Sequence, residues 1–152
     1  LSNPTSRAEC TAEDAYRHTK GRAVFAGGSP FPQVEMDGRT FVPGQANNIY
    51  IFPGVGLGVM AVKATRVTDE MFAAAAKSLD EQVSKDDLEK GRIFPSLARI
   101  RDVSAAIALA VAKVAFAGKL TAMKEPSNLP GYIKSLMYDP VYSSYVPANK
   151  YG

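Results

Sequence analysis

Short apolar runs separated by turn residues fill the first third of the chain, a pattern typical of the end of an α/β unit. Thr11 stands where a helix N-cap belongs, and the acidic residues Glu13 and Asp14 follow in the first turn. Gly21 suits the left-handed position that ends such a helix near Lys20. The pattern predicts one short helix in this region.

Two strand signals follow the helix. The apolar residues 23–26, next to glycines, predict a short buried strand. Asp37-Gly38 separates the runs 34–36 and 40–42, which predicts a β-hairpin. Between these signals, residues 27–31 (Gly-Gly-Ser-Pro-Phe) form a predicted loop after a strand. Such a loop either lets a cofactor approach the backbone closely or only turns the chain.

From Ile49 onward the pattern becomes small, apolar and helical. We predict a buried helix over about 48–64, irregular in its first turns because of Pro53. A second helix is expected to start after the cap residue Thr68 and to run to about Val83. Its predicted buried face consists of Met71, Phe72, Ala75 and Leu79.

Two further helices are expected before the tail. Ser84 and Asp87 have the spacing of a capping box, which predicts a short helix ending before Gly91. A long helix is predicted over about 101–117, with Gly118 after it. Its predicted buried positions are Val103, Ile107, Val111 and Val114.

The tail after Gly118 is rich in proline and tyrosine and poor in aliphatic residues. We expect it to pack on another surface, often that of a second subunit, because tyrosine combines apolar area with a polar group. A mobile tail is the alternative. The residues concerned are Pro126, Pro130, Pro140 and Pro147 with Tyr132, Tyr138, Tyr142, Tyr145 and Tyr151.

Composition narrows the class of protein. With 152 residues, 46% of them hydrophobic, the chain has material for one domain or pieces of two with a buried core. The net charge of +3 is small and spread out, which argues against nucleic-acid binding. The apolar stretches 49–62 and 105–117 are shorter than the ~20 residues of a transmembrane helix, so we expect no membrane span. The chain begins at Leu1, not Met, and we expect it to be a fragment.

Most signatures of catalytic chemistry are absent from the sequence. It contains no Gly-x-Gly-x-x-Gly after a strand, no P-loop and no Cys or His spacing for a metal. His18 is interpreted as a solvated helix residue. Cys10 is interpreted as a packing residue, not a nucleophile.

Three asparagines are the candidate ligand contacts. Asn3 follows an apparent strand end, the place where α/β sheets bind ligands. Asn47 and Asn48 open an apolar helix, where free N–H groups attract anions. The structural alternatives are a turn residue at Asn3 and an N-cap at Asn48.

An ordered series of motifs resembles the malic enzymes. The resemblance covers nearly the whole chain and is strongest up to Ala117. Gln-Ala-Asn-Asn and the C-terminal end are most similar to plant-type and algal NADP-dependent enzymes, whereas Gly27 replaces an expected Ser or Thr. The matching segments are residues 1–6 (Leu-Ser-Asn-Pro-Thr-Ser), 8–13, 25–31, 43–48, 51–54, 91–95 (Gly-Arg-Ile-Phe-Pro) and 100–104.

The resemblance implies oxidative decarboxylation of L-malate to pyruvate and CO2, with NADP as the hydride acceptor and Mg²⁺ or Mn²⁺ as the metal. It implies that Asn3 and Asn48 bind the substrate carboxylate and the reacting end of the nicotinamide, with Asn47 beside them on the cofactor. The family's tyrosine acid, lysine base, metal ligands and phosphate loop would lie upstream. The chain is therefore expected to carry no catalytic residue and no metal ligand, and to be inactive alone.

The resemblance also implies an organisation. Residues 1–47 would finish a Rossmann-like NADP-binding domain, 48–118 would be the helical part of the adjoining domain, and 119–152 would be an extension at subunit contacts of a dimer or tetramer. A non-catalytic oligomerisation module is the alternative function. The compartment, cytoplasm or plastid (chloroplast), stays open.

Overall fold

The first helix, α1 (Ala12–His18), begins at a complete capping box. In the computed structural model, which describes residues 2–141, the backbone N–H of Asp14 donates to the Thr11 hydroxyl and the Asp14 carboxylate accepts from the Thr11 N–H. Lys20 and Gly21 then turn the chain with φ of 53° and 71°. A single 3₁₀ turn, η1 (Thr5–Arg7), precedes the helix. The predicted cap is confirmed, and the helix ends slightly before Lys20.

Two small sheets follow α1. Strands β1 (Ala26–Gly27) and β4 (Gly44–Gln45) are parallel, while β2 (Val34–Met36) and β3 (Arg39–Phe41) form an antiparallel hairpin. Asp37 and Gly38 at the hairpin turn both have positive φ, so the predicted hairpin is confirmed. The strand predicted over 23–26 is wrong in its bounds. Only Ala26 of that run pairs, because β4 is too short to pair with the rest.

An aromatic cluster forms the core of this α/β lobe. The buried ring of Tyr16 on α1 stacks on Phe41 at 4.6 Å between centroids. Phe25 meets the Tyr16 ring edge-on at 6.3 Å and meets Phe31 at 5.2 Å. These rings bury the inner sides of α1 and the hairpin, and they hold the segment before β1 against both.

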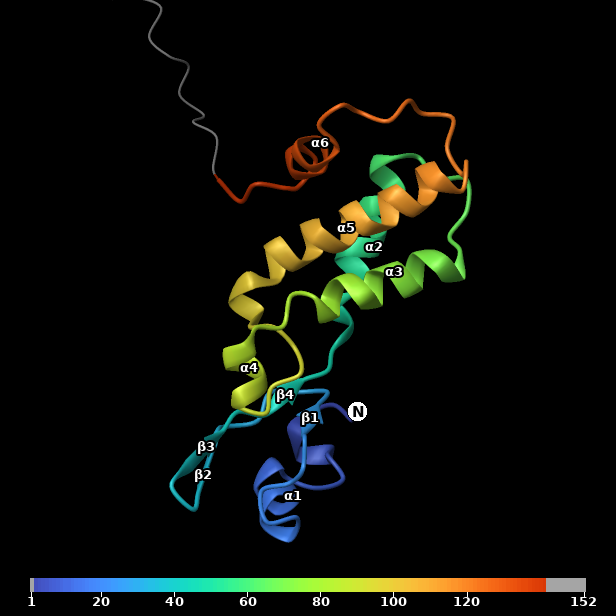
Figure 1. Cartoon of the computed structure of the whole chain (residues 1–152). Coiled ribbons are helices and arrows are strands. Elements are labelled where there is room, and N and C mark those ends of the chain that lie inside the picture. Colours follow the sequence, from blue (N-terminus) through green and yellow to red (C-terminus); the bar gives the residue numbers. More distant parts are fainter. Residues whose placement is uncertain (1, 142–152) are drawn as a thin grey trace, which may run out of the picture.

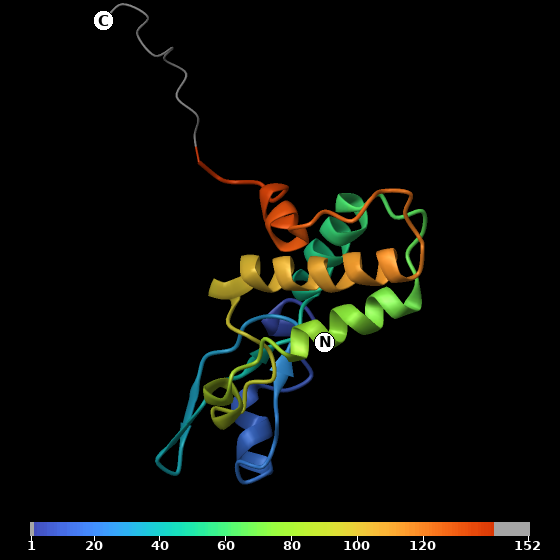
Figure 2. The same cartoon turned by 45° about the horizontal axis from the view of Figure 1, so that its top comes forward.

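Most of the remaining elements form a helical lobe around α5, while α4 lies beside β4 (Figure 1). Figure 2 shows α5 between α3 on one side and α2 and α6 on the other. The elements are η2 (Asn48–Tyr50), α2 (Phe52–Ala61), α3 (Asp69–Asp80), α4 (Lys85–Glu89), η3 (Leu97–Arg99), α5 (Ile100–Ala117) and α6 (Leu129–Ser135).

Most predicted helices are confirmed, with three corrections. The irregular start before Pro53 is the 3₁₀ turn η2, and Ser84 and Asp87 form the predicted capping box. Thr68 precedes α3 but its hydroxyl accepts no capping hydrogen bond. Phe72 is 49% exposed instead of buried, because the face of α3 that meets α5 is narrower than predicted. Val114 is only partly buried.

Helix α6 was not predicted. Asn128 caps it by accepting a hydrogen bond from Gly131 N–H, and Pro130 lies in its first turn. Its Leu129 and Ile133 are buried in the core around α5. The first part of the predicted extension therefore packs on this chain itself. Tyr142, Tyr145, Pro147 and Tyr151 of the same predicted tail lie outside the described residues, as does Leu1.

Helix α2 is apolar on every side. Gly54, Val55, Gly58 and Ala61 face the core, but Phe52 and Met60 are 67% and 78% exposed. Nearby Ile49 is also exposed. We call Ile49, Phe52 and Met60 the outer α2 surface. Within residues 2–141, no helix combines the length and the apolarity that a bilayer span requires.

The close contact between α2 and α5 requires glycine. A Cβ on Gly54 would lie 2.6 Å from Ile107 Cβ, and one on Gly58 would lie 2.7 Å from the Ala108 carbonyl oxygen. Gly56, on the outer side of the same helix, has open space around it. Helix propensity alone favours alanine over glycine at all three positions. A difference between alanine substitutions at these positions therefore reports the packing against α5.

We therefore expect Gly54→Ala and Gly58→Ala each to lower the free energy of unfolding by about 1–3 kcal/mol through overpacking. Gly56→Ala, the matched control, should raise it by about 0.5–1 kcal/mol. Urea unfolding followed by circular dichroism measures all three. Equal effects at the three positions would contradict the proposed packing.

Candidate functional site

The candidate site lies at the carboxyl ends of β1 and β4. Because the two strands are parallel, the loop after β1 and the segment after β4 leave the sheet at the same edge. The Asn47 amide donates to the Gly28 carbonyl oxygen at 3.2 Å, and the Gln45 amide approaches the same oxygen at 3.5 Å. Two side chains from the β4 segment thus hold one carbonyl of the loop.

Asn3 reaches the same loop from the N-terminal turn. The Ser29 hydroxyl donates to Asn3 Oδ1 at 2.5 Å, and the Thr5 hydroxyl donates to the Pro30 carbonyl at 3.2 Å. The structure therefore brings two of the three candidate asparagines, Asn3 and Asn47, to one loop. Asn3 lies at the start of the α/β lobe in the sequence, and Asn47 lies at its end.

The third asparagine, Asn48, is the exposed first residue of η2. The predicted N-cap is one residue off, because Asn47 Oδ1 accepts the hydrogen bond from Ile49 N–H at 3.0 Å. The argument from anion attraction also fails for both residues, since the α-helix itself starts only at Phe52. Within residues 2–141, the side chain of Asn48 makes no hydrogen bond.

The loop between these groups is tightly packed. Gly27 and Gly28 are buried, and the ring of Phe31 would lie 2.7 Å from a Cβ on Gly27. Phe31 occupies this space because its ring also packs edge-on against Phe25. The loop is thus a rigid support for the side chains that reach it.

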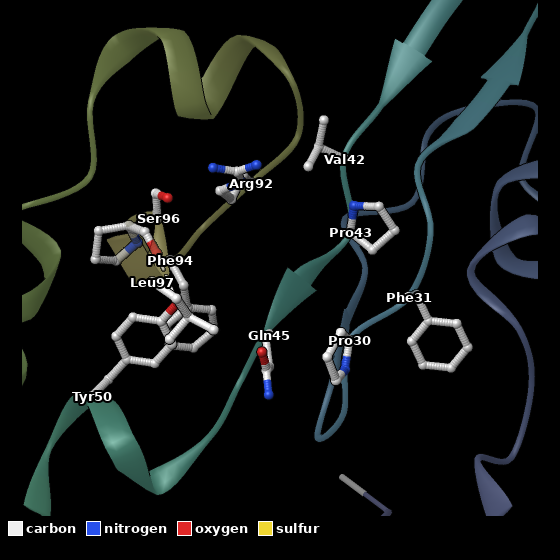
Figure 3. A pocket seen from close by; sticks show the side chains of 11 residues that line it. Pro30, Phe31, Val42, Pro43, Gln45, Tyr50, Arg92, Phe94, Ser96 and Leu97 are labelled. Carbon is white, nitrogen blue, oxygen red and sulfur yellow. Dashed lines mark hydrogen bonds between the residues drawn. The ribbon is translucent and has the colours of Figure 1, made fainter. Parts of the chain in front are cut away.

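A groove of about 210 Å³ adjoins the loop (Figure 3). Pro30 and Gln45 lie on one side of it, and Phe94, Ser96 and Leu97 on the other. Tyr50 lines it next to Phe94: the ring stacks on Phe94, and the hydroxyl donates to the Pro95 carbonyl at 2.7 Å. Burial raises the pKa of the Tyr50 hydroxyl, which stays protonated as this donor.

Sequence reasoning missed this groove, although its signal was present. Gly-Arg-Ile-Phe-Pro at 91–95 contributes Arg92, Phe94 and Pro95 to its lining. The segment reaches the groove because the Val42 N–H donates to the Lys90 carbonyl at 3.1 Å, which joins the end of α4 to the chain between β3 and β4.

An ion pair between Arg92 and Asp87 lies next to the groove. Arg92 Nη1 lies 3.1 Å from Asp87 Oδ1, with both side chains partly buried. The hydrogen bond from the Ser84 hydroxyl is the main reason that the pKa of the Asp87 carboxyl lies below its usual value, and Arg92 lowers that pKa further. Asp87 is therefore ionised at neutral pH and neutralises Arg92.

The residues that the structure describes do not fit a divalent metal ion. Among 2–141, no three His, Cys, Asp or Glu side chains gather into a metal-binding group. His18 is exposed on α1, as predicted. Cys10 is free and exposed, so its interpretation as a packing residue is wrong. It lies in the bend directly before α1.

Parallel strands that carry a glycine loop and amide side chains at their carboxyl ends place the candidate ligand contacts where proteins of the α/β class bind ligands. The sequence profile of the family described as "Malic enzyme, NAD binding domain" matches residues 1–116, and the chain belongs to this family. The predicted α/β fold class with a Rossmann-like part is thereby confirmed.

Similar proteins are named NADP-dependent malic enzymes. The chain is 55% identical to the one from Vitis vinifera, over 95% of this chain and 25% of the relative. It is 53% identical to a chloroplastic one from Zea mays, over 95% of this chain and 23% of the relative. The one from Phaseolus vulgaris is 54% identical, with 95% and 25% covered. The chain thus spans about a quarter of the length of these relatives.

The capping carboxylate beside the groove gives a pH-dependent prediction. We expect Asp87→Ala to lower the free energy of unfolding by about 1 kcal/mol at neutral pH. The folded pKa lies below the unfolded value of about 3.9, so this contribution is complete above that value and is lost as the pH falls through the folded pKa. Urea unfolding from about pH 7 to about pH 3 should show the variant and the original chain converging at acid pH.

Asp86→Ala is the matched control for this experiment. Asp86 is an exposed acidic residue in the same first turn of α4. Its substitution should change stability by less than about 0.5 kcal/mol. The role given to the carboxylate would be contradicted if the free energies of unfolding of Asp87→Ala and the original chain differed by the same amount down to low pH.

Proposed function

We propose that this chain supplies the part of an NADP-dependent malic enzyme that faces the substrate and the nicotinamide. The proposed reaction of the whole enzyme is the oxidative decarboxylation of L-malate to pyruvate and CO2. The main supporting observation is the convergence of Asn3 and Asn47 on the Gly28–Ser29 loop, at the strand edge where α/β proteins bind ligands. Identity to relatives named NADP-dependent malic enzymes supports the choice of reaction and cofactor.

The asparagine amides suit the proposed ligands because they are uncharged and bind both carboxylates and carboxamides. Asn3 and Asn48 are assigned to the substrate carboxylate and to the reacting end of NADP. Asn47 is assigned to the cofactor side: one of its amide N–H groups holds Gly28, and the second stays available for the nicotinamide. When bound, NADP supplies the hydride acceptor. The contribution of this chain is orientation.

Other parts of the reaction are assigned to segments outside this chain. The described residues provide no donor set for Mg²⁺ or Mn²⁺, so no step is assigned to a metal here. We also propose the division into residues 1–47, 48–118 and 119–152. The separate cores around Tyr16 and around α5 support the first boundary.

Assembly and compartment follow from the same proposal. The exposed outer α2 surface supports contacts with further protein, either the rest of the enzyme or other subunits of a dimer or tetramer. Names that include "chloroplastic", as for the maize and rice relatives, support the plastid as the compartment, with the cytoplasm as the alternative.

The role of Asn48 is tested in the complete enzyme. We expect Asn48→Ala to reduce kcat/KM for malate by about 10²-fold, because a misoriented substrate reacts slowly. The oligomeric state should stay the same as that of the original enzyme in size-exclusion chromatography with light scattering. Asn128→Ala, the same substitution at the cap of α6, should leave kcat/KM unchanged. Unchanged kinetics for Asn48→Ala would exclude a ligand contact at this residue.

The isolated chain of 152 residues should turn over no malate, even with NADP and Mn²⁺ added. It should bind the dye ANS through the outer α2 surface, and Phe52→Ser with Met60→Ser should reduce the dye fluorescence. Steady-state assays and fluorescence titration measure both properties. A sharp two-state melt without ANS binding would favour a self-sufficient interaction module instead.

A further inference from the structure

Ser29 lies between the rigid loop and the Asn3 side chain. Its hydroxyl has one proton, and that proton is donated to Asn3 Oδ1. Ser29 is half-buried and follows the buried glycines Gly27 and Gly28. Its position is therefore set by the loop backbone and not by contact with solvent.

The loop that carries Ser29 is held at both ends. Asn47 and Gln45 approach the Gly28 carbonyl, one residue before Ser29. Thr5 donates to the Pro30 carbonyl, one residue after it. A side chain on such a support has a defined direction, which positioning of a ligand-binding group requires.

The hydrogen bond from Ser29 also determines which way the Asn3 amide faces. A primary amide carries its acceptor oxygen and its donor nitrogen on opposite sides of one carbon. With the oxygen turned to Ser29, the Nδ2 group of Asn3 is turned away from the loop. Asn3 is otherwise exposed, and Ser29 is its one side-chain hydrogen-bond partner within residues 2–141.

We infer that Ser29 is a positioning residue: it presents the Asn3 Nδ2 group as a donor to an oxygen of the bound carboxylate substrate. This inference rests on the proposed function and adds a residue to it. Without the hydroxyl, the amide turns freely, and its oxygen faces the substrate part of the time. Two oxygens then meet, which disfavours the productive complex.

Four variants of the complete enzyme test the inference: Ser29→Ala, Ser29→Thr, Asn3→Ala and the double variant Asn3→Ala with Ser29→Ala. Ser29→Ala should lower kcat/KM for malate on the order of 10-fold, and Ser29→Thr, which keeps the hydroxyl, should restore most of the activity. Asn3→Ala should lower it by about 10²-fold. The double variant should be no slower than Asn3→Ala alone, because Ser29 acts only through Asn3.

Ser135→Ala on α6 is the control, since it removes a hydroxyl hydrogen bond far along the chain and should leave kcat and KM unchanged. Thermal melts and light scattering check that every variant is folded and assembled. A merely structural role would make the losses from Ser29→Ala and Asn3→Ala multiply in the double variant, and that result overturns the inference.

The remaining outcomes separate this inference from the proposed function. A slow Asn3→Ala enzyme together with Ser29→Ala at the original rate overturns the positioning role and leaves Asn3 as a ligand contact. Asn3→Ala at the original rate overturns the proposed contact itself, and the positioning role with it. A Ser29→Thr enzyme as slow as Ser29→Ala also overturns the positioning role.

Discussion

Two backbone hydrogen bonds between β1 and β4 determine where the candidate site lies. Gly44 N–H donates to the Phe25 carbonyl at 2.9 Å, and Ala46 N–H donates to the Gly27 carbonyl at 2.8 Å. They place the loop after β1 next to the segment that carries Asn47 and Asn48. The hydrogen bonds from the Gln45 and Asn47 amides to the Gly28 carbonyl depend on this parallel pairing, because it brings the β4 segment alongside the loop.

The helical lobe supports this edge through a second close contact. Gly54 and Gly58 let α2 approach the backbone of α5, which fixes the start of α2 and therefore the turn η2 before it. Tyr50 at the end of η2 is held in this position by its hydrogen bond to the Pro95 carbonyl. The position of Asn48 thus follows from packing that is remote from it in sequence.

The sequence predicted the parts of the fold that neighbouring residues determine. The N-cap at Thr11, the capping box at Ser84 and the Asp37-Gly38 turn depend on residues within three positions of each other. Helix α6 was missed, because its short apolar face becomes meaningful only against α5. The asparagines were identified, but the contact between Asn3 and Ser29 spans 26 residues, and no local pattern encodes it. The groove beside Tyr50 was missed because its sides come from segments far apart in the sequence, although the motif at 91–95 that lines it was recognisable.

The apolar character of α2 has a consequence for mutational tolerance. Its ten residues, Phe52–Ala61, include no charged or hydrogen-bonding side chain. On one face glycine cannot be enlarged without a clash with α5. On the other face, a charged residue is incompatible with any protein partner that covers Phe52 and Met60. Few amino-acid substitutions in this segment therefore leave function unchanged. Random mutagenesis of α2 would return an unusually high fraction of defective clones.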